Sequence, residues 1–233
     1  MSLKKKMIDK LSNTWVDRVI GLFYASMELG AMSAFHQDLG LQLIKTIRKE
    51  DRFLMCRPSE MYIIYSLANA QRSLEGDYAE VGVYKGATAR LICEAKGDKH
   101  LHLFDTFEGL PKLGEGDIRF SEKMFAASLD QVKRRLSPFQ NVFFHQGFFP
   151  KTAEPVKDRR FAFIHLDVDI YQSTKDALEF FYPRLVPGGV LISHDFPSAD
   201  GVRRAFMEFL SNKPEKIIGL PLSQGMIIKQ GSL

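Results

Sequence analysis

The chain has 233 residues, of which 45% are hydrophobic, and this content suits one α/β domain with a buried core. The net charge of +4 is mild and the basic residues are spread out, so the composition does not demand a nucleic acid partner. No apolar run reaches the roughly 18 residues of a membrane span, and the first residues lack the apolar segment of a signal peptide, so the protein is expected to be cytoplasmic. Cys56 and Cys93 have neither metal-like nor redox spacing, so both are expected to be reduced core residues.

Residues 1–75 are predicted to be mainly helical and to extend the α/β part, residues 76–233, within the same domain. Apolar side chains recur there at helical spacing. A helix rich in Tyr, Ile and Leu is predicted over Glu60–Leu74, begun by Pro58. The Met and aromatic side chains of residues 15–36 favour a core or dimer contact over a substrate lid, so a homodimer is among the expected assemblies.

A glycine-containing turn joins the first predicted strand, Asp77–Val83, to a helix over Ala87–Ala95. The first N–H groups of this helix suit an anionic ligand group. A dinucleotide turn has the spacing G-x-G-x-x-G, but Tyr84 stands at the second glycine position, where a pyrophosphate would meet its side chain. An ordinary structural turn is the alternative to a cofactor site. The pattern E-x-G-x-x-x-G-x-T resembles the first motif of class I S-adenosylmethionine-dependent methyltransferases, including catechol O-methyltransferase, and is carried by Glu80, Gly82, Gly86 and Thr88.

The rest of the chain alternates predicted strands and helices. Further strands are predicted over His100–Phe104, Asn141–His145, Phe161–Leu166, Val190–Ser193, Lys216–Leu220 and Met226–Lys229. Helices are predicted over Phe125–Leu136, from Ser173 with Asp176 in a capping box, and over Gly201–Leu210. Residues Lys112–Ser121 are predicted to form a flexible loop able to close over a substrate. This alternation predicts an α/β fold: a Rossmann-like, doubly wound, mostly parallel seven-stranded sheet with helices on both faces.

Polar residues stand at the carboxyl ends of five predicted strands. Parallel strands linked by helices bring these ends to one edge, where ligands bind. Asp105 follows Glu80 by about 25 residues, and an acidic residue there can accept both hydrogens of a ribose diol. A helix cap or a surface carboxylate is the alternative for Asp105, and Gln146 is placed to contact an adenine edge. The residues expected to bind the cofactor are Glu80, Gly82, Tyr84, Gly86, Thr88, Asp105, Thr106, Gln146, Gly147 and Asp167.

The segment Leu166–Phe196, with its D-x-D-x-Y-x-S-T motif and downstream P-G-G, resembles the macrocin O-methyltransferase family, which methylates sugar hydroxyls in natural products. The runs DTFEGLP at 105–111 and FHQGFFPKT at 144–152 are similar to it too. The resemblance covers roughly residues 56–210 and implies an S-adenosylmethionine-dependent O-methyltransferase acting on a small-molecule hydroxyl. The acceptor is not inherited, because the chain ends, which usually set it, resemble the family only weakly.

The resemblance also implies a divalent metal, Mg²⁺ or Mn²⁺. In the family, the first Asp of the motif and an acidic pair after the fifth strand hold magnesium, and these positions match Asp167, His194 and Asp195. Imidazole suits zinc, manganese or iron better than magnesium, so the identity of the metal stays open. The lysine of catechol O-methyltransferase is absent, since Ile170 stands at its position.

Two catalytic arrangements follow. With a metal, Asp167 or Asp169 takes the proton of the acceptor; without one, His194 is the better base because its unperturbed pKa is about 6.5. Alternatively, Asp167 only orients the cofactor, Asp195 caps a helix and His194 is structural. At the level of the whole protein, the alternatives are a scaffold that kept the fold without the chemistry and an NAD-dependent oxidoreductase. The expected partner is a small-molecule acceptor, not a nucleic acid or a membrane.

Overall fold

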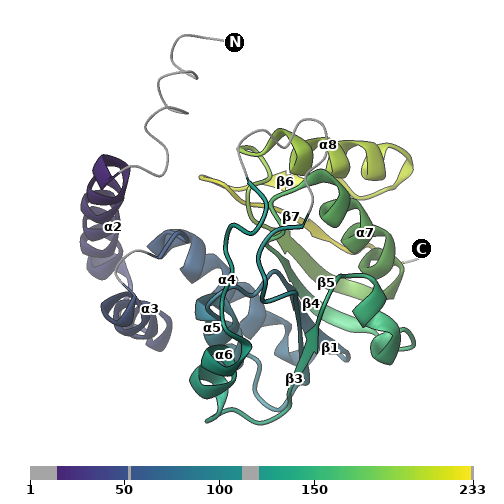
Figure 1. Ribbon diagram of the computed structural model, residues 1–233, viewed down its shortest axis with the longest axis horizontal. Helices are drawn as coiled ribbons and strands as arrows, with labels where there is room; N and C mark the ends of the chain where they lie inside the picture. The colour runs from purple at the N-terminus through teal and green to yellow at the C-terminus, as the bar shows by residue number, and fades with distance from the viewer. Residues whose placement is uncertain (1–14, 52–53, 112–120, 232–233) are drawn as a thin grey trace. The chain divides into compact units, whose positions relative to one another are not determined.

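The computed structural model describes residues 15–51, 54–111 and 121–231 (Figure 1). The chain divides into two compact units, Met1–Ile63 and Ile64–Leu233, so that the division falls inside helix α4 (Pro58–Ala70). The boundary of the helical extension at residue 75 stays a prediction. Most of the loop predicted over Lys112–Ser121 lies outside the described residues. Among the residues that are described, no helix combines the length and apolar content needed to cross a bilayer.

The first unit contains helices α2 (Trp15–Phe35) and α3 (Leu39–Glu50). Asp38 caps α3, its carboxylate accepting a hydrogen bond from the backbone N–H of Leu41 at 3.0 Å. This bond satisfies one of the N–H groups that a helix start leaves free. The buried residues of α3 share one face at helical spacing, and they are Gly40, Leu41, Leu43, Ile44 and Ile47.

The second unit is built on one seven-stranded sheet with the strand order β3-β2-β1-β4-β5-β7-β6. The first five strands along the chain pair in parallel, whereas β7 is antiparallel to both β5 and β6. This arrangement confirms the predicted Rossmann-like, mostly parallel sheet. The strands are β1 (Asp77–Val81), β2 (Leu101–Asp105), β3 (Val142–Gln146), β4 (Phe161–Leu166), β5 (Leu185–Ser193), β6 (Ile218–Gly219) and β7 (Gly225–Ile228).

Helices cover both faces of this sheet, α5 and α6 on one side and α7 and α8 on the other (Figure 1). Their bounds are α5 (Ala87–Ala95), α6 (Leu129–Leu136), α7 (Tyr171–Phe181) and α8 (Asp200–Phe209). Short 3₁₀ segments join the elements at η1 (Gln71–Ser73), η2 (Lys151–Val156), η3 (Tyr182–Arg184) and η4 (Leu210–Asn212).

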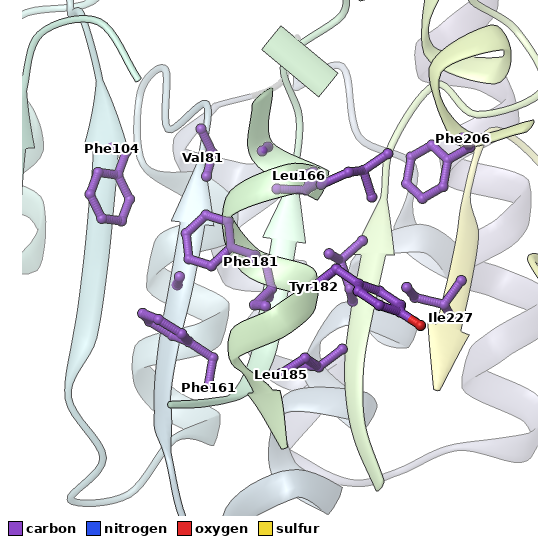
Figure 2. Packing of buried hydrophobic residues seen from close by; sticks show 14 of the residues in the cluster. Val81, Phe104, Phe161, Leu166, Phe181, Tyr182, Leu185, Phe206 and Ile227 are labelled. Atoms are coloured by element: carbon purple, nitrogen blue, oxygen red, sulfur yellow. The ribbon is translucent and has the colours of Figure 1, made fainter. Parts of the chain in front are cut away.

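A core of aromatic and aliphatic side chains fills the space between the sheet and helices α7 and α8 (Figure 2). Phe181 of α7 lies against the ring of Phe161 on β4, with centroids 5.0 Å apart, and Phe206 of α8 is completely buried. Burying such side chains is the main favourable term in folding. The core therefore fixes β1, β4 and β5 side by side and, with them, the positions of their carboxyl ends.

The order of strands reverses at β1, because the chain passes from β1 to β2 on one side and later returns to β4 on the other. In open α/β sheets, ligands bind outside the carboxyl ends of the strands at such a reversal. The topology therefore directs attention to the residues that follow β1, β2 and β3 on one side and β4 and β5 on the other.

Several element boundaries differ from the sequence prediction, and helix α4, for example, ends at Ala70 instead of Leu74. Helix α6 begins at Leu129 instead of Phe125, whose φ of +61° is left-handed. Helix α7 begins two residues before Ser173, and Asp176 accepts a hydrogen bond from Gln172 at 2.7 Å, so the predicted capping box is wrong. Strand β5 starts at Leu185, since the Pro-Gly-Gly run expected to be a turn is part of the strand.

Candidate functional site

The turn between β1 and α5 has left-handed backbone at three residues, Gly82 (φ +85°), Tyr84 (φ +48°) and Gly86 (φ +76°). At Gly82 a glycine is required, because a Cβ there would lie 1.9 Å from the backbone carbonyl oxygen of Asp167. Gly86 is the N-cap of α5 and has no side chain that could occupy the first N–H groups of the helix. The turn thus brings the end of β1 against the end of β4 and presents backbone donors beside them.

Asp105, the last residue of β2, holds this turn in place. Its Oδ2 accepts hydrogen bonds from the backbone N–H groups of Val83 at 2.7 Å and Tyr84 at 2.8 Å. Its Oδ1 accepts one from the N–H of Phe107 at 2.7 Å. A carboxylate has about four lone-pair sites, and the described residues occupy three of them, which leaves one on Oδ1 for a further donor. Asp105 therefore has a structural role that its predicted ribose contact did not include.

Glu80 and His165 form a buried pair between the neighbouring strands β1 and β4. Nδ1 of His165 lies 2.8 Å from Oε1 of Glu80. Burial raises the pKa of Glu80, against the opposing effect of its hydrogen bonds with His165 and Thr88. Oε2 of Glu80 and Nε2 of His165 are buried without a hydrogen-bond partner among the described residues. Leaving such atoms unpaired is costly, so they require a water molecule or a polar ligand group.

The ends of β2 and β3 lie next to each other at the same edge. Asp105 pairs in register with Gln146, whose side chain is exposed, and the N–H of Gly147 donates to the carbonyl of Asp105 at 3.0 Å. The hydroxyl of Thr106 is used locally, donating to the carbonyl of Gly109 at 2.9 Å. These predicted cofactor residues therefore lie together, and their binding roles stay predictions.

A cluster of two carboxylates and an imidazole lies where β4 and β5 end, and these strands pair in parallel. Nδ1 of His194 is 3.6 Å from Oδ1 of Asp167 and 3.4 Å from Oδ2 of Asp195. One ligand atom from each of the three residues lies within 4.8 Å of the others. The predicted metal ligands, which include the predicted base His194, thus lie close enough together to hold one metal ion.

Ser223, in the loop between β6 and β7, contacts the other side of the same imidazole. Its Oγ lies 3.1 Å from Nε2 of His194. The loop reaches this position because β7 runs antiparallel to β5, with Gly225 opposite Ser193. Both ring nitrogens of His194 therefore face a partner, which restricts the orientation of the ring.

Asp169 lies beside this cluster in a left-handed conformation, φ +62°, and Asp195 has φ +57°. Such backbone costs about 1–3 kcal/mol for a residue with a side chain and is frequent at functional sites. Burial, followed by the charges of Asp167 and Asp195, raises the pKa of Asp169 well above its usual value, while His194 acts in the opposite direction. Asp169 is therefore a carboxyl group that keeps its proton at higher pH than an ordinary aspartate.

The donor set of Asp167, His194 and Asp195 fits a divalent metal. One imidazole nitrogen with carboxylate oxygens suits Mn²⁺, Zn²⁺ or Fe²⁺ better than Mg²⁺, which prefers oxygen ligands alone. Metal-bound histidines usually hydrogen-bond through the second ring nitrogen, and Ser223 is placed to accept that bond.

Two contacts of the site were missed by the sequence prediction. His165 lies in an apolar run that predicts a buried strand. A histidine inside such a run needs a polar partner, and this was the signal that could have indicated its contact with Glu80. Nothing in the pattern around Ser223 indicates its contact with His194, because that contact depends on how β7 pairs with β5.

Two curated relatives are O-methyltransferases of natural products. The 8-demethyl-8-(2,3-dimethoxy-alpha-L-rhamnosyl)-tetracenomycin-C 4'-O-methyltransferase of Streptomyces olivaceus is 34% identical, over 58% of this chain and 58% of that protein. The mycinamicin III 3''-O-methyltransferase of Micromonospora griseorubida is 32% identical, over 52% of this chain and 55% of that protein. The matches thus span little more than half the length of these two relatives.

Solved structures share the fold. The O-methyltransferase NovP aligns with a TM-score of 0.64 and 24% identity, covering 72% of this chain and 78% of that chain. The calicheamicin methyltransferase CalS11 aligns with a TM-score of 0.63 and 18% identity, covering 88% of this chain and 91% of that chain. The sequence model of the macrocin-O-methyltransferase (TylF) family matches residues 66–223, which is well over half of the chain. With the sheet order and the residues at its edge, this match establishes that the chain belongs to the macrocin O-methyltransferase (TylF) family.

Proposed function

We propose that this protein transfers the methyl group of S-adenosylmethionine to a hydroxyl oxygen of a small acceptor of the sugar or natural-product type. The observation that carries the proposal is the contact between the β1–α5 turn and the end of β4, where Gly82 lies against the backbone of Asp167. A turn suited to the methyl donor and a cluster of proton-accepting groups are therefore adjacent. The acceptor class is supported by the activities named for the two relatives, whose matches span 58% and 55% of their length.

On the donor side, we assign the nucleoside part of S-adenosylmethionine to the ends of β2 and β3. The free lone pair of Asp105 accepts a ribose hydroxyl, and Gln146 contacts the adenine edge. The turn residues Gly82, Tyr84 and Gly86 and the buried Glu80 border the methionine part, and Asp167 contacts its amine. In this assignment the turn serves two purposes, since the same Asp105 carboxylate orders the turn and contacts the ligand.

The methyl transfer itself is a direct displacement. The bond from the acceptor oxygen to the methyl carbon forms as the carbon–sulfur bond breaks, and the proton of the acceptor hydroxyl passes to a base. Holding the two reactants in line contributes roughly 7–11 kcal/mol in favourable cases. Since a sulfonium is already a good leaving group, the remaining demand on the protein is deprotonation of the hydroxyl.

Two groups serve as base in alternative arrangements of the same cluster. Without a metal, His194 accepts the proton, oriented by Ser223 at Nε2 and by the carboxylates near Nδ1. With Asp167, His194 and Asp195 as metal ligands, Asp169 accepts it, since this carboxyl group lies beside the cluster and contacts Asp195. A bound divalent metal would supply Lewis-acid polarisation that lowers the pKa of the acceptor hydroxyl.

Binding of S-adenosylhomocysteine, measured by calorimetry beside NAD, tests the cofactor class. We expect binding of S-adenosylhomocysteine and none of NAD; tight binding of NAD without binding of S-adenosylhomocysteine would refute the proposal.

Transfer from S-adenosylmethionine with a labelled methyl group to sugar and phenolic acceptors, followed by mass spectrometry, tests the reaction. Transfer abolished by EDTA and restored by Mn²⁺ supports the metal arrangement. Full activity in EDTA that is lost in His194→Ala supports the histidine base instead.

We also propose a cytoplasmic location and a homodimer. Cys56 and Cys93 are both buried thiols outside any disulfide, which suits a reducing compartment. Helix α2 exposes large apolar side chains such as Phe23 and Met27, which suit a contact between copies. Sedimentation of the wild type and of Phe23→Ser tests the assembly, since the variant is expected to be monomeric where the wild type is dimeric.

A further inference from the structure

A second cluster of metal-ligating side chains lies at the opposite ends of the strands, where β1 and β2 begin. Asp77 is the first residue of β1, His100 directly precedes β2 and His102 lies within β2. Oδ1 of Asp77 is 3.6 Å from Nδ1 of His100, and Oδ2 is 3.2 Å from Nε2 of His102. One ligand atom from each residue lies within 4.8 Å of the others. From this arrangement we propose that Asp77, His100 and His102 bind a zinc-class divalent metal ion, at a site separate from the methyl-transfer edge.

The three side chains lie close enough together for a tetrahedral site to form. Zinc lies about 2.0–2.2 Å from imidazole nitrogen and carboxylate oxygen, so neighbouring ligand atoms of a tetrahedron are about 3.3–3.6 Å apart. The 3.6 Å and 3.2 Å separations run to different oxygens of Asp77, and one ligand atom from each residue lies within 4.8 Å of the others, so a rotation of the side chains brings the three atoms to zinc distance. Three protein ligands leave the fourth position to water.

The second ring nitrogen of His102 has the partner that a ligand histidine needs. Its Nδ1 lies 3.1 Å from Nε2 of His145 on β3. A ligand histidine usually hydrogen-bonds through its second ring nitrogen, and His145 is placed to accept such a bond. In the tautomer that donates from Nδ1 to His145, His102 presents an unprotonated Nε2 to the metal. The contact is thus compatible with the ligating tautomer.

Nitrogen-bearing side chains lie close to the carboxylate of this cluster. The side chains of His100, His102 and Arg159 all lie within 3.8 Å of the carboxylate of Asp77. The ring of Phe143 stacks on His102 and meets His100 edge-on, which covers the imidazoles with an apolar side chain. Among the described residues, Arg159 is a competing charge, with Nη1 3.8 Å from Oδ2 of Asp77, and its side chain is 54% exposed.

Zinc titration of a protein carrying His194→Ala tests this site, because that background removes the histidine of the other cluster. Calorimetry is expected to give binding of a single zinc ion, and Co²⁺ is expected to show the intense visible absorption of a tetrahedral site. Adding His100→Ala should weaken zinc binding by at least about 100-fold, since loss of even an outer partner costs 10–100-fold. His36→Ala is the matched control, a histidine beside a carboxylate, Asp38, at 3.8 Å, and should change nothing.

The folding of the variants is checked separately. His100 is 37% exposed, so its replacement should leave the thermal midpoint in EDTA unchanged, whereas added zinc should raise the midpoint only while His100 and Asp77 are present. Asp77→Asn, which keeps the shape of the side chain, should also lose the zinc-dependent rise. The proposal is overturned if the His194→Ala protein binds no zinc, or if adding His100→Ala leaves zinc binding as tight as before. None of these measurements depends on methyl transfer.

Discussion

Replacing Asp105 with alanine should destabilise the protein before any ligand is added. The carboxylate accepts three backbone hydrogen bonds, from Val83, Tyr84 and Phe107, at 2.7–2.8 Å. A hydrogen bond to a charged group contributes about 1.5–3 kcal/mol, but Asp105 is half-buried and water replaces part of what is lost. We therefore expect the free energy of unfolding to fall by about 3–5 kcal/mol. For a protein of this size, that corresponds to a thermal midpoint lower by about 6–20 °C.

Urea denaturation without ligand, followed by titration with S-adenosylhomocysteine, separates the two roles of Asp105. If the residue only contacted ribose, Asp105→Ala would unfold like the wild type and bind the ligand more weakly. Glu108→Ala is the control, because it removes an exposed carboxylate from the segment that follows β2 and should alter neither measurement. A loss of less than about 1 kcal/mol in Asp105→Ala would refute the reasoning that this carboxylate holds the turn.

Three further predictions concern other parts of the site. Gly82→Ala places a Cβ 1.9 Å from a backbone carbonyl oxygen at a φ of +85°, so we expect this variant to unfold at a much lower urea concentration than Gly219→Ala. The control is suitable because a Cβ at Gly219 meets nothing within 4 Å, and equal urea midpoints would contradict the prediction. Ser223→Ala removes the partner of His194 Nε2 and should weaken Mn²⁺ binding by about 10–100-fold in calorimetry, a result that unchanged affinity would rule out. Because burial raises the pKa of Glu80, the folded state binds this proton more tightly than the unfolded chain, and the associated stability is present below pH 4.5 and lost as the pH rises through the raised value. Between pH 4.5 and 7, the free energy of unfolding of Glu80→Gln, measured by urea titration, should therefore fall less than that of the wild type. Parallel plots of this free energy against pH for the two proteins would argue against it.

The sheet and its edge were predictable because their signals are local. Apolar runs at short spacing mark the strands, and Gly82 and Asp105 stand at strand ends that parallel pairing must bring together. The helix starts were less predictable. The backbone at Phe125 is left-handed, and the edge contact between its ring and Tyr84, with centroids 5.8 Å apart, shows that tertiary packing acts on this segment.

Contacts that depend on long-range register were not predictable. Ser223 meets His194 only because β7 lies antiparallel beside β5, and a turn serine carries no mark of that pairing. The three backbone hydrogen bonds that Asp105 accepts were not predictable for a related reason. The sequence pattern shows which residue ends β2 but not how many backbone N–H groups point toward its side chain.

The contact between Gly82 and the backbone of Asp167 also limits how such a protein can be redesigned. Because a single methyl group does not fit there, the ends of β1 and β4 cannot shift independently, and any change made to one is transmitted to the other. The loop between β6 and β7 is restricted at Ser223, which contacts His194, and at the buried Gln224, but Leu222 is exposed. Redesign therefore belongs at exposed loop positions such as Leu222, where a side chain can change while the contact between the two strand ends is left intact.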